Sequence, residues 1–274
     1  MRTGPALVAE IDACRVAEGQ CAFWWLGQQS FVVKMGDAVC YLDPFLSNFE
    51  GRRVAPLLAP GDLTNATLIL GSHDHGDHID RAVWPALAKA SSAARFVVPE
   101  LLRERIVREV GLPAERVLGV DDGTSVEAGG VRVTGVPAAH ELLDTDAATG
   151  LHPYVGFIVE GADFRLYHAG DTCLYEGMQA RLRTWRLDLA FLPINGRDAK
   201  RLATGCIGNM TYQEAADLAG TLRPGLTVPA HFEMFAMNSE DPALFADYMR
   251  VKYPDLRVQV PRHGECVIVE RVGE

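Results

Sequence analysis

Ser72-His73-Asp74-His75-Gly76-Asp77-His78-Ile79-Asp80 is the stretch around which the rest of this sequence is arranged. It places three histidines and three carboxylates directly after an apolar run at 68–70. In extended backbone, alternate side chains share a face, and a glycine then allows the chain to turn. Imidazole nitrogens and carboxylate oxygens are the usual ligands of zinc and similar divalent ions. The stretch therefore predicts half of the ligands of two adjacent metal ions; the alternative is a solvated polar loop after a strand.

Composition limits the classes of protein that this chain can represent. Its 274 residues are 48% hydrophobic, which is enough for a substantial core in one domain or in two tightly fused halves. No apolar run approaches the roughly 20 residues of a membrane-spanning helix, and the N-terminus is unlike a signal peptide. Six scattered cysteines without a Cys-x-x-Cys pair predict free thiols and a cytoplasmic protein.

The net charge of −10 argues against nucleic acid as a partner, because a phosphate backbone is bound by basic surfaces. A small anionic substrate stays compatible with this charge if a local basic cluster lies in the cleft. No membrane partner is expected, and the sequence leaves a homo-oligomer open.

The predicted strands outnumber the predicted helices, and several strands are adjacent in sequence. This order favours two mixed sheets packed face to face with helices outside, an α/β (α+β) fold, over a doubly wound parallel sheet. Residues 46–64 and 193–210 are predicted to be loops. Helices are expected at 6–17, 80–90, 99–110, 211–222 and 244–251. Strands are expected at 22–27, 30–35, 38–42, 67–71, 95–98, 116–120, 125–128, 131–136, 154–160, 164–168, 187–192, 226–228, 256–260 and 266–270.

Three further polar residues stand at predicted strand ends, each after an apolar run. They are His140, Asp171 and His231. Ligands that converge from several strand ends onto one edge are typical of a site held by a rigid scaffold. We therefore expect these three side chains to complete the metal site, with Glu141 or Asp144 as the alternative to His140.

The order His73-x-His75-x-Asp77-His78, then His140, Asp171 and His231, resembles the metallo-β-lactamase superfamily. The resemblance implies a four-layer αββα sandwich with the metals at one edge of the two sheets. It spans roughly residues 22–270, so it implies a single hydrolase domain over 1–274, in which 1–20 form an N-terminal extension. It also implies two divalent ions, Zn²⁺ or Mn²⁺.

A narrower resemblance is carried by three stretches of the chain. Phe23–Gly27, His73–Asp80 and Leu166–Asp171 are similar to the L-ascorbate-6-phosphate lactonase branch. That branch hydrolyses a phosphorylated sugar lactone and is associated with manganese, whereas the wider superfamily mostly uses zinc.

The resemblance also implies a role for each ligand. One ion would be held by His73, His75 and His140, the second by Asp77, His78 and His231, and Asp171 would bridge them. Two ions about 3.5–4 Å apart can share a water and lower its pKa towards about 7, which makes hydroxide the nucleophile. The leaving alkoxide is reprotonated from water or from a metal-bound carboxylate, which makes Asp77 and Asp171 the catalytic carboxylates.

Other polar residues are expected around these ligands. Asp43 and Asp74 are candidates to orient ligating histidines, with strand-end capping as the alternative. His168 is expected either behind the ligands or against the substrate. His152 and His263 are assigned to surface or core roles, and the pair Trp24-Trp25 to core packing, with a platform for a ligand as the alternative.

One basic cluster stands out in this acidic chain. Arg197, Lys200 and Arg201 lie in a single predicted loop, and we expect them to bind a substrate phosphate or carboxylate. The alternative is an ordinary solvated loop.

The leading hypothesis is therefore a metal-dependent hydrolase of a small anionic ester, in particular a phosphorylated sugar lactone. A phosphodiesterase is the nearest alternative. A non-catalytic metal-dependent sensor or assembly protein is the third, although it would be expected to lack part of the ligand set.

Overall fold

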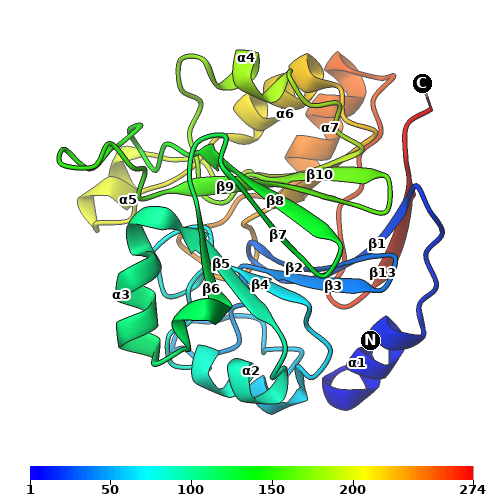
Figure 1. The fold of residues 1–274 in the computed structure, drawn as a ribbon. Coiled ribbons are helices and arrows are strands. Elements are labelled where there is room, and N and C mark those ends of the chain that lie inside the picture. Colours follow the sequence, from blue (N-terminus) through cyan, green and yellow to red (C-terminus); the bar gives the residue numbers. More distant parts are fainter. Residues whose placement is uncertain (274) are drawn as a thin grey trace.

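Two mixed β-sheets face each other in the computed structural model, which describes residues 1–273, and helices cover their outer faces (Figure 1). The predicted sandwich is therefore confirmed. The first sheet has the order β13 (Cys266–Glu270), β1 (Gln20–Gly27), β2 (Ser30–Met35), β3 (Ala38–Leu42), β4 (Leu68–Leu70), β5 (Arg95–Pro99) and β6 (Val117–Val120). The second has the order β12 (Leu226–Ala230), β11 (Leu189–Pro193), β10 (Phe164–His168), β9 (Val155–Gly161), β8 (Val131–Pro137) and β7 (Ser125–Ala128).

The helices divide between the two outer faces. Helices α1 (Gly4–Ala13), α2 (Trp84–Ala90) and α3 (Glu100–Val110) lie on the side of the first sheet, and α4 (Met178–Leu182), α6 (Tyr212–Leu222) and α7 (Pro242–Lys252) lie on the side of the second (Figure 1). The short α5 (Ala199–Ala203) stands apart from them in the loop that follows β11. Among residues 1–273, none of these helices has the length and apolar character needed to cross a membrane.

Strand β1 shows why the chain forms layers. Successive side chains of a strand point to opposite faces. Phe23 and Trp25 therefore join the core that lies between the sheets, whereas Trp24 joins the core under α1, α2 and α3. Both tryptophans are buried, as the sequence predicts. The first sheet therefore presents apolar side chains on both of its faces, one packed against the second sheet and the other against the helices.

The predicted capping box at the start of α6 is present. The hydroxyl of Thr211 accepts a hydrogen bond from the backbone N–H of Glu214 at 3.2 Å, and the Glu214 carboxylate accepts one from the N–H of Thr211 at 2.9 Å. These two bonds satisfy amides that the first helical turn leaves free, which fixes where the helix begins.

Some element boundaries were predicted wrongly. Residues 256–260 form no strand; Val258 makes only an isolated bridge to Thr227, because Pro254 and Pro261 flank a segment too short to extend the sheet. The predicted loop at 193–210 contains α5, and α4 was not predicted at all, since helices of five residues carry little periodic pattern. Helix α1 begins two residues earlier than expected and ends at Ala13 rather than at 17.

Candidate metal centre

The predicted ligands come together at one edge, where the carboxyl ends of strands from both sheets meet. The turn that carries His73, His75, Asp77 and His78 follows β4, His140 follows β8, Asp171 follows β10, and His231 follows β12. Parallel neighbours bring their carboxyl ends to the same edge, and β10, β11 and β12 are parallel in this way. The fold therefore assembles side chains that lie far apart in sequence.

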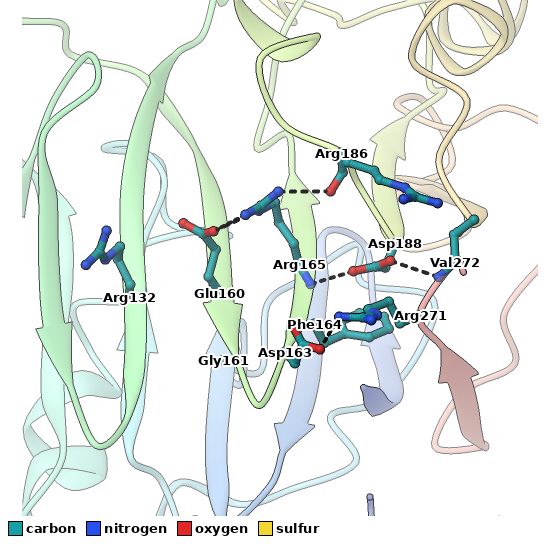
Figure 2. Close-up of a pocket in the computed structure, with 10 residues that line it drawn as sticks. All are labelled: Arg132, Glu160, Gly161, Asp163, Phe164, Arg165, Arg186, Asp188, Arg271 and Val272. Carbon is teal, nitrogen blue, oxygen red and sulfur yellow. Dashed lines mark hydrogen bonds and ion pairs between the residues drawn. The ribbon is translucent and has the colours of Figure 1, made fainter. Parts of the chain in front are cut away.

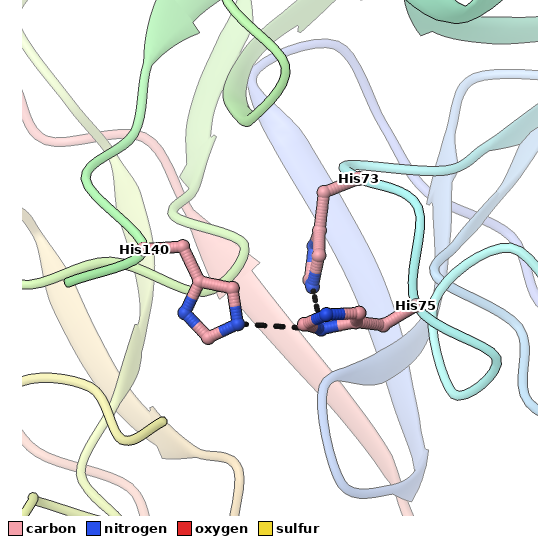
Figure 3. A group of neighbouring side chains, drawn as sticks. All are labelled: His73, His75 and His140. Atoms are coloured by element: carbon pink, nitrogen blue, oxygen red, sulfur yellow. Dashed lines mark hydrogen bonds between the residues drawn. The ribbon is translucent and has the colours of Figure 1, made fainter. Parts of the chain in front are cut away.

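The first group of side chains consists of three histidines (Figure 3). The Nε2 atom of His73 lies 2.9 Å from Nδ1 of His75, and Nε2 of His140 lies 3.2 Å from the same Nδ1. Ligands bonded to one zinc ion at about 2.0–2.1 Å lie about 3–3.4 Å from one another. These nitrogens are therefore placed to bind one ion.

The second group consists of Asp77, His78 and His231. Asp171 lies between the two groups, because it also forms a candidate ligand set with His73 and His78. Its Oδ1 is 3.4 Å from Nε2 of His78, and its Oδ2 is 3.1 Å from Nε2 of His231. This position, between the groups, is the one that a bridging carboxylate needs.

The electrostatics of the first group suit metal binding. Burial lowers the pKa of His73 well below its usual value and lowers the pKa of His140 to about 4. Both rings are thus neutral near pH 7, and a neutral imidazole has the free lone pair that a metal requires.

In the second group, neighbouring charges outweigh the effect of burial on the pKa values of the side chains. Burial lowers the pKa of His78, but the carboxylates of Asp171, Asp77 and Asp43 outweigh it and hold that pKa well above its usual value. Burial raises the pKa of Asp171, but His231 and His78 outweigh it and keep this carboxyl group ionised. His78 Nε2 and Asp171 Oδ1 are both buried and lie 3.4 Å apart, and among the described residues neither atom makes a well-formed hydrogen bond. Such atoms are costly unless something binds them, so the donor set fits a divalent cation.

Asp43 has the orienting role that the sequence suggests. Its Oδ2 lies 2.7 Å from Nδ1 of His78, and its two oxygens accept hydrogen bonds from the backbone N–H and the hydroxyl of Ser72, both at 2.7 Å. A carboxylate on the far nitrogen of a ligating histidine fixes the ring and its tautomer.

The same prediction for Asp74 is wrong. Its carboxylate points away from the ligands and pairs with Arg81 and Arg105. Residues 73–75 form a bend in which the backbone N–H of His75 donates to the carbonyl oxygen of His73 at 3.0 Å, and the Asp74 side chain leaves this bend towards the two arginines. It ties the ligand turn to α3.

His168 takes the first of its two expected roles. Its side chain has no exposed surface, and its Nε2 lies 3.0 Å from Oδ2 of Asp43. It therefore lies behind Asp43 and supports it, and the expectation that His168 contacts the substrate is corrected.

The predicted basic cluster is engaged in local contacts. Arg197 donates two hydrogen bonds to the Glu214 carboxylate at 2.6 and 2.8 Å, and Arg201 bonds the backbone oxygens of Asn195 and Gly196 and pairs with Asp198. The structure thus favours the solvated-loop alternative for both arginines, because their guanidinium groups are already bonded to neighbouring residues of this protein. Lys200 is exposed.

His152 and His263 lie outside the ligand set, as expected. His152 Nδ1 is 2.9 Å from Asp121, and the ring of His263 stacks on that of Trp25 with centroids 4.2 Å apart. Both histidines serve packing.

Two residues near the ligands were not predicted. Tyr154 lies with its ring centroid 5.6 Å from that of His73 and 5.2 Å from that of His140. Gln28, in the turn between β1 and β2, reaches Asp77 and His231. The only sign of Gln28 in the sequence is a polar pair, Gln28-Gln29, between two apolar strands.

A cavity of about 400 Å³ opens at the other end of the second sheet, around the turn between β9 and β10 (Figure 2). Four arginines line it, but each has a partner: Arg165 pairs with Glu160 at 2.7 Å, Arg132 with Glu127 at 2.6 Å, Arg271 with Asp163, and Arg186 with the backbone oxygen of Gly273. This cavity takes no part in the metal centre.

Comparison with known proteins agrees with this geometry. The family model described as beta-lactamase superfamily domain matches residues 40–232. A UPF0173 metal-dependent hydrolase of Nitratidesulfovibrio vulgaris is 32% identical over 259 residues, which cover 93% of this chain and 98% of that protein. One of Pyrobaculum arsenaticum is 33% identical over 224 residues, which cover 81% of this chain and 88% of that protein.

Solved structures share the fold at lower identity. A metallo hydrolase from Ignicoccus hospitalis superposes with a TM-score of 0.71 at 22% identity, covering 92% of this chain and 99% of that one. The isothiocyanate hydrolase from Delia radicum gut bacteria gives a TM-score of 0.69 at 17% identity, covering 91% and 99%.

Proposed function

The chain belongs to the metallo-β-lactamase superfamily of metal-dependent hydrolases, and on that premise we propose that it hydrolyses a small anionic ester, in particular a phosphorylated sugar lactone, with two divalent ions. The observation that carries the two-ion proposal is the position of Asp171 between two candidate ligand groups. His73, His75 and His140 would hold one ion, and Asp77, His78 and His231 the other. Bound ions would polarise the ester carbonyl and lower the pKa of a water towards about 7.

The side chains near the ligands favour water as the nucleophile. The hydroxyl of Ser72 is buried and donates to Asp43 at 2.7 Å. The thiol of Cys173 is also buried, lies 3.7 Å from the backbone oxygen of Gly208, and has a pKa that burial raises. Neither group is presented to a substrate as an alkoxide or a thiolate.

The two carboxylates of the centre differ in exposure, which suggests different tasks. Asp171 is buried and held between His78 and His231, so it maintains the geometry. The side chain of Asp77 is 22% exposed, so it can take a proton from an attacking water and return it to the leaving alkoxide. In a lactone this alkoxide stays tethered to the acyl group, which keeps it beside Asp77.

The test is metal analysis followed by turnover of a substrate panel. We expect protein loaded with Zn²⁺ or Mn²⁺ to hydrolyse sugar lactones faster than bis-p-nitrophenyl phosphate. Faster turnover of the phosphodiester would favour the phosphodiesterase alternative, and turnover of neither substrate by fully loaded protein would favour the sensor alternative.

A pair of variants ties the activity to the centre. His140→Ala removes a candidate ligand, and we expect it to lower lactone turnover by more than about 100-fold. His152→Ala removes a histidine that lies outside both ligand groups, and it should keep the wild-type rate. Equal rates for the two variants would contradict the proposed site.

A further inference from the structure

Gln28 is held against the metal centre by its backbone. It occupies the turn between β1 and β2 with φ of +53°, a conformation that side-chain-bearing residues rarely adopt. Its carbonyl oxygen accepts hydrogen bonds from the backbone N–H of His231 at 2.9 Å and from Nε1 of Trp25 at 3.0 Å. The hydrogen bond from His231 therefore holds this strained turn beside the second ligand group.

The side chain of Gln28 is fully buried and ends among the ligand atoms. Its terminal nitrogen lies 3.2 Å from Oδ2 of Asp77 and 3.0 Å from Nε2 of His231. These separations match those between Asp171 and the histidines of the same group, 3.1 and 3.4 Å. The end of the Gln28 side chain thus occupies one more position in the same set of ligands.

The orientation of the amide follows from the charge of the ion. The Nε2 atom of His231 faces Asp171 and would bind the metal through its lone pair, so it could not also accept a hydrogen bond from Gln28. An NH₂ group would point its partial positive charge at a cation, whereas a carbonyl oxygen would bind it. The oxygen and nitrogen of an amide differ only in the partners that suit them, and half a turn about the last side-chain bond exchanges them.

We propose that the side-chain oxygen of Gln28 is a ligand of the ion held by Asp77, His78 and His231. The inference rests on the proposed two-ion centre. The second ion then has three oxygen ligands, an amide oxygen from Gln28 and carboxylate oxygens from Asp77 and Asp171, whereas the first group supplies three imidazoles. Because carboxylate and carbonyl oxygens suit Mn²⁺, Mn²⁺ is a suitable probe of this site.

The experiment measures Mn²⁺ binding directly. Metal-free protein is titrated with Mn²⁺ alone, and the free ion is followed by electron paramagnetic resonance, which requires no turnover. Wild-type protein should bind two ions. Gln28→Met keeps the length of the side chain but has no amide oxygen, so it should bind the second ion about 100-fold more weakly or worse.

Two further variants make the test specific. Gln28→Glu keeps an oxygen in place and adds a charge, so it should hold the second ion at least as tightly as wild type. If the amide instead donates a hydrogen bond to Asp77, the added carboxylate will repel Asp77, and loss of the second ion in Gln28→Glu would overturn the proposal. Gln29→Met alters the same turn at an equally buried glutamine, whose one side-chain hydrogen bond among the described residues goes to the backbone oxygen of Gly170 at 3.1 Å, and should bind both ions normally.

The outcomes separate this inference from the proposed function. Wild-type protein that binds fewer than two ions would defeat the two-ion centre and Gln28 together. Two ions bound equally well by wild type and by Gln28→Met would defeat the role of Gln28 alone. Unfolding of each metal-free variant in urea confirms that it is folded.

Discussion

Oδ2 of Asp43 lies 2.7 Å from Nδ1 of His78, and neither side chain has any exposed surface. This contact directs the opposite ring nitrogen, Nε2, towards Asp171 at 3.4 Å. Burial raises the pKa of Asp43, but His78 and His168 outweigh it and hold that pKa well below its usual value. Asp43 is thus an ionised carboxylate held by His78, His168 and Ser72.

Replacing Asp43 should weaken metal binding although Asp43 is not a ligand. Asp43→Asn removes the charge that holds Nδ1–H of His78, so we expect affinity for the second ion to fall about 10–100-fold. Titration with Mn²⁺ measures this. Asp74→Asn is the matched control, since Asp74 lies beside the ligands in sequence but pairs with Arg81 and Arg105. Equal losses in both variants would show that the effect is only one of charge.

Metal removal should abolish activity, but the protein should remain folded. The two cores are built from apolar side chains of the sheets and helices, so they do not depend on the ions. Bound ions add stability by mass action, about 4 kcal/mol when free metal is 1,000 times its dissociation constant. We expect chelation to lower the melting temperature, keep the far-ultraviolet circular dichroism of the folded state, and allow recovery of activity when metal is returned. Complete unfolding on chelation would contradict this expectation.

Arg197 should prove to be a stabilising residue and not a substrate contact. Its guanidinium already bonds both oxygens of Glu214. We expect Arg197→Ala to lower the free energy of unfolding by about 1 kcal/mol and to leave KM for anionic esters unchanged. Lys200→Ala removes a nearby exposed charge and serves as the control for stability. A KM that rises for anionic but not for neutral esters in Arg197→Ala would restore the original hypothesis.

The Arg197–Glu214 pair should make stability depend on pH. The hydrogen bond from Arg197 lowers the pKa of Glu214 below its usual 4.5. The contribution is therefore fully present above about pH 4.5 and is lost as the pH falls through the lowered pKa. We expect wild type to exceed Glu214→Gln by about 1–2 kcal/mol in urea unfolding at pH 7 and by less at pH 3. A difference independent of pH would show that the carboxylate charge is not the cause.

Gly170 should tolerate no side chain. Its φ is +59°, and a Cβ there would lie 2.9 Å from Cβ of Ser72 and 3.1 Å from the backbone oxygen of Val155. Gly170→Ala should therefore push Asp171 away from the ligand turn, lowering stability by about 2–4 kcal/mol and weakening metal binding. Gly111→Ala has the same backbone problem, with φ of +71°, but no atom within 4 Å. It should lose only about 1–2 kcal/mol and bind metal normally. Similar effects in both would rule out the close contact with Ser72 as the cause.

The predictions that succeeded rest on local rules. The ligand turn could be found because metals select imidazole and carboxylate groups, and because few other sites concentrate them after a strand. The strands were found because short apolar and aromatic runs end at turn-forming residues, as in β1, which is buried from Cys21 to Gly27. The start of α6 could be predicted from the sequence because a capping box needs only Thr211 and Glu214, three residues apart.

The sequence by itself therefore determined which chemistry the chain can perform, since the ligand types and their order were present in it. Only the tertiary structure decided what each neighbouring polar residue does. Asp43 and Asp74 both stand near the ligand histidines, yet one holds His78 and the other faces α3. Gln28 and His231 are 203 positions apart and meet only because strands of both sheets end at one edge. A ligand type is a property of a single residue, whereas the direction of a side chain and its distant partner depend on how the sheets pack.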